Sequence, residues 1–438
     1  MGPGRLSGRR PARRARRWAG PLLALLALLA CAQGCSAPVP HGGGPAQGPA
    51  RTVEECSRVL PCGVTAKRVT RHLEDGRAVR ISVVSVAPSA GVEVRVVHGA
   101  HVATAGTVEQ LAHLAGAVAA VNGAFFATVE LPGYPGYPGD VLGVEVADGR
   151  LVSEAADGAT ALILPGPGGG RPRVDEVATR LTLRADDGAR RELDGVNRVP
   201  GRILGCGGTG GDLLAATRKP ESRPRHNQLC VDDSEIVAFG PEWGVSSPPG
   251  ADGSAEVLLD GRGRVTDVRR PAGGRIPRGG STLAGIGEGA DWLLAHARRG
   301  RRVARDVQVT GREGGSVLAG HTDVIGAGPA LVRDGKQWIN SAANGFAPGA
   351  RDEREPRTVA AVKKDGTLLL AVFDGRTASS AGVSLVEAAE EVLRMGAVEA
   401  VNLDGGGSST AVVGGELLNE PSDGEQRPVA DALAVVPR

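Results

Sequence analysis

The stretch from Ala397 to Thr410 constrains the fold most, because an apolar run ends there in one carboxylate, three glycines and three hydroxyl residues. The apolar run predicts a buried strand that ends directly before Asp404. Glycine adopts positive φ readily, so the backbone of Gly405–Gly407 could lie against a ligand and its amides could hold an anionic oxygen. The alternative is a strand followed by a tight glycine turn in which Asp404 serves as a cap.

The residues before this stretch predict a strand–helix–strand unit. Thr367–Phe373 is an apolar run that ends at Asp374, and Leu385–Met395 shows the 3.6-residue period of an amphipathic helix behind a capping box. If the two strands are parallel, Asp374 and Asp404 lie at the same edge of a sheet. Open sheets commonly bind ligands at that edge.

Short alternating strands separated by Gly, Pro and Asp turns make up most of the remaining chain, which has 67 Gly and 29 Pro among 438 residues. We therefore expect an α+β fold: a β-rich mixed sheet flanked by a few helices, with a β-rich inserted region. The predicted divisions are a signal peptide (1–31), a tether with an N-terminal disulfide segment (32–67), the first part of the main domain (68–150), a β-rich variable insertion (151–315) and the catalytic core (316–438).

The N-terminus has the features of an export signal. Arginines between Arg5 and Arg17 precede the apolar run Pro21–Ala30, which is too short to span a bilayer and is followed by Cys31. Leu28-Leu29-Ala30-Cys31 predicts lipidation at Cys31, with Cys35 as the second candidate. We expect an exported protein, extracellular or attached to the cell surface as a lipoprotein, that meets the membrane only through this lipid anchor.

The other four cysteines are expected to form disulfides, because an even number of cysteines in an exported chain is typical of a disulfide framework. Three pairings are possible, and Cys56–Cys62 with Cys206–Cys230 is favoured because both pairs are local. Zinc is the alternative, although no CxxC or histidine cluster accompanies these cysteines. The net charge of +2 gives no indication of nucleic-acid binding.

Three polar residues, Asn122, Asp374 and Asp404, each follow an apolar strand and precede a glycine. Paired carboxylates can cleave a glycosidic bond, one as proton donor and the other assisting water or the oxocarbenium-like centre. Arg357 and Arg376, together with the glycine amides, could hold a phosphate. The alternative is that these arginines only form structural pairs with the aspartates.

Both tyrosines, Tyr134 and Tyr137, lie in one proline-stiffened loop. Their rings could stack on a sugar face, or they could simply pack the loop. No cofactor is predicted. A divalent metal is possible, since carboxylates and hydroxyls are hard oxygen ligands, but the chain has no D-x-D-x-D-G calcium loop.

Five short motifs, in this order, resemble the phosphodiester glycosidase family over about residues 80–437. They are Val121–Phe126, Arg357-Thr358, Asp374-Gly375-Arg376, Leu403–Ser409 and Arg427-Pro428-Val429. Two departures from the family pattern are Ala124 in place of a second glycine and Val359-Ala360-Ala361 after the Arg-Thr pair.

The resemblance implies hydrolysis of a sugar-1-phosphodiester, of the GlcNAc-1-phosphodiester type, in cell-envelope or extracellular glycans, with release of the sugar and a remaining phosphomonoester. Asp404, Asp374 and Asn122 are the predicted catalytic residues. The predicted substrate-binding residues are Gly123, Arg357, Thr358, Arg376, Gly405, Gly406, Gly407, Ser408, Ser409, Arg427, Tyr134 and Tyr137. The competing hypothesis is a surface glycan-binding protein without turnover.

Overall fold

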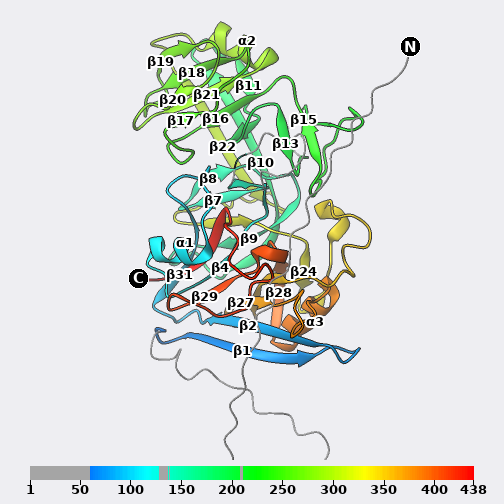
Figure 1. The fold of residues 1–438 in the computed structure, drawn as a ribbon. Helices are drawn as coiled ribbons and strands as arrows, with labels where there is room; N and C mark the ends of the chain where they lie inside the picture. Colours follow the sequence, from blue (N-terminus) through cyan, green and yellow to red (C-terminus); the bar gives the residue numbers. More distant parts are fainter. Residues whose placement is uncertain (1–59, 128–136, 138, 208–210) are drawn as a thin grey trace, which may run out of the picture. The chain divides into compact units, whose positions relative to one another are not determined.

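The computed structural model describes residues 60–127, 137, 139–207 and 211–438, which form many antiparallel strands and three α-helices (Figure 1). The predicted β-rich class is confirmed. The predicted signal peptide with Cys31, the predicted tether with Cys56, and Tyr134 lie outside the described residues. Within the described part, no helix has the length and apolar character needed to cross a membrane.

The sheet that carries Asp374 and Asp404 has the strand order β1–β2–β27–β26–β28–β24–β25. Its strands are β1 (Val64–His72), β2 (Ala78–Val86), β24 (Ala330–Arg333), β25 (Lys336–Gln337), β26 (Arg357–Lys363), β27 (Leu368–Phe373) and β28 (Ala397–Asn402). All its neighbouring strands are antiparallel, so the predicted mixed character is wrong for this sheet. Among the described strands, only β12 (Gly195–Val196) and β16 (Ile236–Phe239) pair in parallel.

The predicted strand–helix–strand unit is present as β27, α3 (Leu385–Arg394) and β28. Strand β26 runs antiparallel to both β27 and β28, so those two strands are parallel to each other with β26 between them. Helix α3 starts with a capping box formed by Ser384 and Glu387, and it packs on one face of the sheet (Figure 1). The carboxyl ends of β27 and β28 therefore share an edge with the first residue of β26, Arg357.

A second sheet, with the order β3–β31–β4–β29–β30, supplies the other half of the main core. Its strands are β3 (Val92–His98), β4 (Ala119–Asn122), β29 (Ala411–Val413), β30 (Glu416–Leu417) and β31 (Asp431–Pro437). Alternating residues such as Ala360 and Val401 of the first sheet pack against Val121 and Leu433 of the second. Helix α1 (Val108–Ala115) packs on the outer face of this second sheet.

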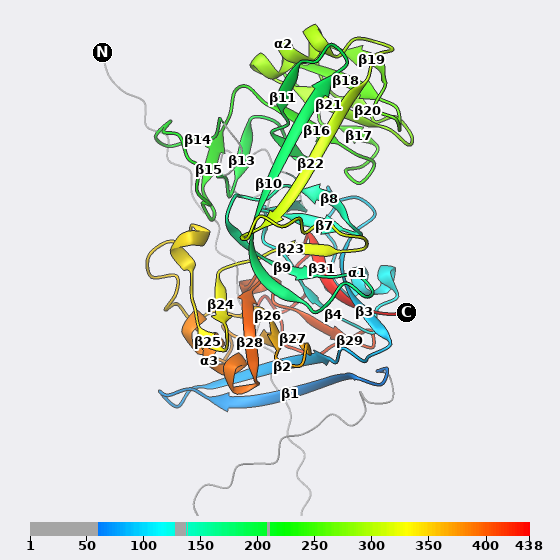
Figure 2. The same cartoon turned by 180° about the vertical axis from the view of Figure 1, so that it is seen from behind.

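The middle of the chain forms further sheets. One contains β7 (Glu145–Ala147), β8 (Arg150–Ser153), β9 (Ala159–Leu164), β10 (Arg173–Ala185), β11 (Arg190–Glu192), β22 (Val303–Gly311) and β23 (Asp323–Gly326). The long strands β10 and β22 run side by side in Figure 2. Because β23 pairs with both β7 and β9, the predicted insertion shares this sheet with the segments on either side of it. The predicted domain boundaries stay predictions.

A five-stranded sheet combines β12 and β16 with β18 (Ala255–Leu259), β19 (Val265–Arg269) and β21 (Ser281–Gly285), and α2 (Gly287–His296) packs on it. A smaller sheet contains β13 (Arg202–Leu204), β14 (Leu213–Leu214) and β15 (Leu229–Val231). The short strands β5 (Phe126–Ala127) and β6 (Asp140–Val141) form a pair, as do β17 (Ser246–Ser247) and β20 (Gly274–Arg275).

The predicted disulfide between Cys206 and Cys230 is confirmed, and it links the β13 and β15 region. Cys62 is exposed and has no disulfide bond to a described residue. Its predicted partner, Cys56, lies outside the described residues, so the Cys56–Cys62 bridge stays a prediction.

Candidate active site

The glycine loop after β28 folds back onto the start of β26. The amide of Gly406 donates to the Pro356 carbonyl at 2.8 Å, and a Cβ on Gly405 would lie 2.8 Å from the same oxygen. Gly406 has φ +59°, a left-handed conformation that favours glycine. The Gly405 amide donates to Asp404 Oδ1 at 2.9 Å. Two of the three glycine amides are thus engaged within the protein, which reduces the anion-binding potential expected from the sequence.

Asp404 is half-buried at the base of this loop, and its amide donates to the Gly123 carbonyl at 3.0 Å. Burial raises the pKa of Asp404 to about 6, while the Ser408 hydroxyl, the Gly405 amide and the charge of Arg427 oppose the rise. At neutral pH the side chain is therefore mostly a carboxylate that can accept a proton readily.

Two arginines border the glycine loop. A Cβ placed on Gly406 would lie 3.5 Å from both terminal nitrogens of Arg376, and one placed on Gly407 would overlap the guanidinium of Arg427. Arg376 is exposed and Arg427 is partly buried. Each also pairs with one carboxylate, Glu355 for Arg376 at 2.5 Å and Asp423 for Arg427 at 2.7 Å. A guanidinium has five N–H donors, so donors remain for an anion at the loop.

Asn122 is fully buried, and its side-chain amide makes three hydrogen bonds. Its Nδ2 donates to the Asp404 carbonyl at 2.8 Å, and its Oδ1 accepts from Thr358 Oγ1 at 2.6 Å and from the Thr410 amide at 3.1 Å. Asn122 and Thr358 therefore join the two sheets to both ends of the glycine loop. The structure places both residues behind the loop, where they set its position.

Asp374 lies at the predicted sheet edge but in different surroundings from Asp404. Its side chain is 4% exposed. Its Oδ1 accepts from Asn419 Nδ2 at 3.1 Å, and its Oδ2 lies 3.4 Å from Arg80 Nε. Burial raises its pKa to about 6, with Asn419 and Arg80 opposing. Because β26 separates the two strands, their ends are about 10 Å apart, two inter-strand spacings.

Within the described residues, the Arg357 side chain makes no hydrogen bond to the glycine loop. Its Nε donates to the Val383 carbonyl and its Nη2 to the Glu353 carbonyl, both at 2.8 Å. Strand alternation turns Arg357 toward the α3 face of the sheet, whereas its neighbour Thr358 faces the second sheet. Burial lowers the pKa of Arg357 to about 10. This arginine fastens the segment that leads into α3.

Tyr137 packs in another part of the molecule. Its ring meets Trp243 edge-on at 4.3 Å, and its hydroxyl donates to the Asn197 carbonyl at 2.5 Å. The ring therefore belongs to the apolar cluster around Phe239. The structure does not bring Tyr137 together with Asp404.

Three buried hydroxyl residues, Ser408, Ser409 and Thr410, follow the three glycines. The side-chain oxygens of Ser409 and Thr410 are buried and have no hydrogen-bond partner among the described residues. Ser408 is also buried, and its hydroxyl lowers the pKa of Asp404. The predicted binding residue Ser409 thus lies directly beside the loop, with its hydroxyl turned into the protein.

Asp431, the first residue of β31, is a site residue that the sequence reasoning missed. It is fully buried, and its Oδ1 accepts from the Ala124 amide at 2.7 Å. A Cβ on Gly123 would overlap this oxygen, so the Asp431 carboxylate occupies the space that a side chain would need. Gly123 separates Asp431 from Asp404: its amide donates to the Asp431 carbonyl, and its own carbonyl accepts from Asp404. The available signal was one acidic residue within the apolar run that follows Arg427.

The pKa of Asp431 depends on its burial and on the carboxyl groups around it. Burial, together with the charge of Asp404, raises the pKa of Asp431 to about 7. Burial also raises the pKa of Glu145 far above its ordinary value, with the charge of Asp431 adding to the effect. Glu145 is fully buried, and neither of its oxygens has a hydrogen-bond partner among the described residues. Asp404, Asp431 and Glu145 thus form a series of interacting carboxyl groups that extends from the glycine loop into the core.

A model of the phosphodiester glycosidase family matches residues 254–436. The N-acetylglucosamine-1-phosphodiester alpha-N-acetylglucosaminidase of Mus musculus is 29% identical over 209 residues, which are 41% of this chain and 39% of that protein. The human protein of the same name is 45% identical over 67 residues, 15% of this chain and 13% of that protein. This chain thus spans well under half of the length of these relatives.

Two solved structures have similar folds. A Burkholderia pseudomallei K96243 protein, titled as exported, superposes with a TM-score of 0.73 at 30% identity, covering 83% of this chain and 74% of that chain. A hypothetical protein from Synechocystis gives a TM-score of 0.66 at 20% identity, covering 86% of this chain and 62% of that chain. The second likeness concerns the fold alone.

Proposed function

This chain belongs to the phosphodiester glycosidase family, and from this premise we propose that it hydrolyses a sugar-1-phosphodiester, releasing the free sugar and leaving a phosphomonoester. The observation that carries the proposal is a half-buried carboxylate, Asp404, at the base of a glycine loop that two arginines border. Such a site combines a proton acceptor with donors for an anionic leaving group.

In the proposed reaction, the Asp404 carboxylate accepts a proton from a water molecule whose oxygen attacks the anomeric carbon. The bond between that carbon and the bridging oxygen breaks, and its electron pair leaves with the phosphate. Arg376 and Arg427 stabilise the charge of the departing phosphomonoester through hydrogen bonds. The proton on Asp404 then passes to solvent, which restores the carboxylate.

Asp374 receives a supporting role in this scheme, because its buried oxygens are already hydrogen-bonded. The same Asn419 amide that donates to Asp374 also donates to the Ser409 carbonyl at 3.0 Å. Asp374 therefore holds Asn419 and, through it, the end of the glycine loop. We propose that Asp374, Asn122 and Asp431 position the loop, while Asp404 meets the substrate.

The proposed substrates are phosphodiester-linked sugars of cell-envelope or extracellular glycans. The export signal and the lipidation motif at Cys31 support this location. A surface glycan-binding protein without turnover is the second candidate, and the following experiment separates the two.

The test measures release of GlcNAc from a GlcNAc-1-phosphodiester by the purified full chain and by an Asp404→Asn variant. We expect the variant to lose about 10²–10⁴-fold in kcat, the usual range for a general base, with little change in Tm. Asp252→Asn, an exposed aspartate in the turn before β18, is the matched control and should retain full activity.

Two outcomes would contradict the proposal. Undiminished turnover by Asp404→Asn would remove Asp404 from the reaction. Glycan binding by the wild-type protein without sugar release, across phosphodiesters of several sugars, would favour the binding protein.

A further inference from the structure

Three buried carboxylates gather outside the candidate active site, where the disulfide-linked sheet meets the five-stranded sheet. Asp212 comes directly before β14, Asp232 directly after β15, and Glu235 directly before β16. One oxygen from each residue lies within 4.8 Å of the other two. The three side chains come from two different sheets, so whatever binds them also joins those sheets.

Positive charge near these carboxylates is scarce. Arg198 is buried: its Nη1 donates to Glu235 Oε2 at 3.0 Å, its Nη2 donates to Glu235 Oε1, and its Nε donates to Glu154 Oε1 at 2.6 Å. Asp194 adds another buried carboxylate, which interacts electrostatically with Glu235 and Asp232. Arg198 therefore divides its charge between Glu235 and Glu154, whereas the hydrogen bonds described for Asp212 and Asp232 come from backbone amides. Buried charge without a counter-charge is strongly unfavourable, so the cluster requires further compensation.

Asp212 provides independent evidence for a bound ion, because one of its buried oxygens has no described partner. Its side chain is 4% exposed, and its Oδ2 accepts from the Gly207 amide at 3.1 Å. Its Oδ1 is buried and has no hydrogen-bond partner within the described structure. Native proteins rarely leave a buried carboxylate oxygen without a partner, and an ion is a common reason.

Gly211, directly before Asp212, allows the Asp232 carboxylate to lie close to the backbone. A Cβ placed on Gly211 would overlap Asp232 Oδ2, so this oxygen lies against the backbone directly before Asp212. The other oxygen of Asp232 accepts from the Ser234 amide at 2.8 Å. Asp232 therefore presents one oxygen toward the Asp212 segment while the other fixes its orientation.

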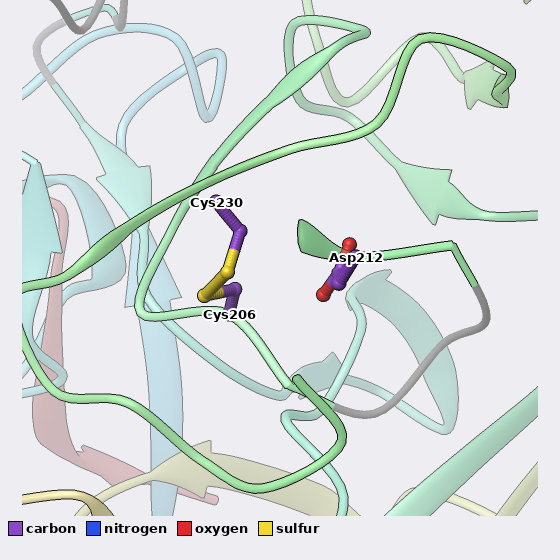
Figure 3. A group of neighbouring side chains, drawn as sticks. All are labelled: Cys206, Asp212 and Cys230. Atoms are coloured by element: carbon purple, nitrogen blue, oxygen red, sulfur yellow. A yellow bond between two sulfur atoms is a disulfide. The ribbon is translucent and has the colours of Figure 1, made fainter. Parts of the chain in front are cut away.

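The surroundings favour oxygen coordination. Figure 3 shows the Asp212 carboxylate beside Cys206 and Cys230, whose sulfurs are joined in a disulfide and so provide no thiolate ligand. A cavity of about 40 Å³ is also bordered by Asp212, which gives room for a water ligand.

We propose that Asp212, Asp232 and Glu235 bind one hard divalent cation, with Ca²⁺ preferred. Ca²⁺ accepts six to eight oxygen ligands in flexible geometry and uses waters to complete them, whereas Mg²⁺ demands a stricter octahedron. The cation supplies the missing positive charge and fastens β14 and β15 to the start of β16.

The test compares the full chain after chelator treatment with the same protein in millimolar Ca²⁺ or Mg²⁺, at slightly alkaline pH so that the carboxylates are ionised. We expect calorimetry to detect one Ca²⁺ per chain, and the Tm to rise by several degrees with Ca²⁺ and by less with Mg²⁺. Asp212→Asn should abolish both responses. Asp233→Asn should keep them, because Asp233 is 77% exposed in the same segment and pairs with Arg218.

The absence of stoichiometric Ca²⁺ binding by the wild-type protein would overturn the proposal, as would unchanged binding by Asp212→Asn. If Asp212→Asn does not fold, Asp232→Asn takes its place, and the metal content of the purified wild-type chain provides a readout that needs no variant. Stabilisation by Asp212→Asn together with an unresponsive wild-type protein would show that protons, and not a cation, compensate the cluster.

Discussion

At the residue scale, the candidate site depends on Gly123, which lies between two carboxylates. The Asp431 carboxylate fills the space of the missing Cβ, and the Gly123 carbonyl accepts the Asp404 amide. Any larger residue would displace Asp431 or Ile325. The family pattern therefore reflects a packing requirement at this position, because the φ of Gly123 lies outside the left-handed region.

The buried charge of Asp431 predicts a change in stability with pH. Its pKa rises from 3.8 to about 7 on folding, so between these values the folded protein binds more protons than the unfolded chain. Stability attributable to Asp431 therefore falls as pH rises through this interval. Asp431→Asn keeps an oxygen for the Ala124 amide and cannot ionise. We expect thermal melts to show a higher Tm than wild type at about pH 8, and a smaller difference in the same direction at about pH 5.

The exposed variant Asp252→Asn is the control for this comparison and should follow the wild-type pH curve. Parallel curves for Asp431→Asn and wild type would mean that Asp431 does not carry the proposed charge. A lower Tm for Asp431→Asn at both pH values would instead point to a hydrogen bond that only the carboxyl group can make.

At the element scale, strand β26 is central, because it lies between the two parallel strands that end in Asp374 and Asp404. Its first two residues face opposite ways. Arg357 fastens the segment before α3, and Thr358 bonds Asn122 of the second sheet. At this edge, one face of the sheet therefore holds the segment before α3, and the opposite face holds the glycine loop.

Asn122→Ala tests this connection between the sheets. The change removes hydrogen bonds to Asp404, Thr358 and Thr410, and it leaves buried polar groups unpaired, each at a cost of about 1–3 kcal/mol. We expect chemical denaturation to show a loss of at least about 3 kcal/mol in unfolding free energy.

Gln308→Ala, which truncates an exposed amide on β22, should change the free energy of unfolding by less than about 0.5 kcal/mol. A double-mutant cycle with Thr358→Val isolates the bond between the sheets. Additive effects in that cycle would contradict the coupling between Asn122 and Thr358.

At the scale of the whole molecule, separate apolar clusters support the candidate site and the middle of the chain. The strands around Asp404 pack with β4 and β31 in one cluster, whereas β16, β18 and β21 pack with α2 in another. The Cys206–Cys230 disulfide links β13 and β15, where Leu204 packs with Ala127 in a further small cluster. Local changes there should therefore leave the reaction chemistry intact.

Removing both cysteines, as Cys206→Ser with Cys230→Ser, tests this separation. The bond spans a sequence separation of 24 residues, and its loss should cost about 3 kcal/mol by the loop-closure relation. We expect hydrogen exchange to accelerate mainly in β13–β16, with kcat on the sugar phosphodiester unchanged below the melting transition. Equal loss of protection in β26–β28 would show that the two regions unfold as one unit.

Local patterns were sufficient to predict several parts of the molecule. Apolar runs and a capping box located β27, α3 and β28, and their parallel direction placed Asp374 and Asp404 at one sheet edge. The disulfide between Cys206 and Cys230 also followed from proximity along the chain. These features depend on residues close in sequence, whose periodicity and chemistry are visible without the fold.

Only the tertiary structure decided which of the predicted residues face the glycine loop. Asn122 bonds residues more than two hundred positions away, Arg357 turns toward α3, and Asp431 reaches Gly123 across an antiparallel strand pair. No local periodicity encodes such long-range pairings, because they depend on how the two sheets pack. The sequence alone therefore identified Asp374, Asp404 and the glycine loop. The packing of the sheets decided that Asp404, and not Asn122 or Arg357, lies half-buried beside that loop.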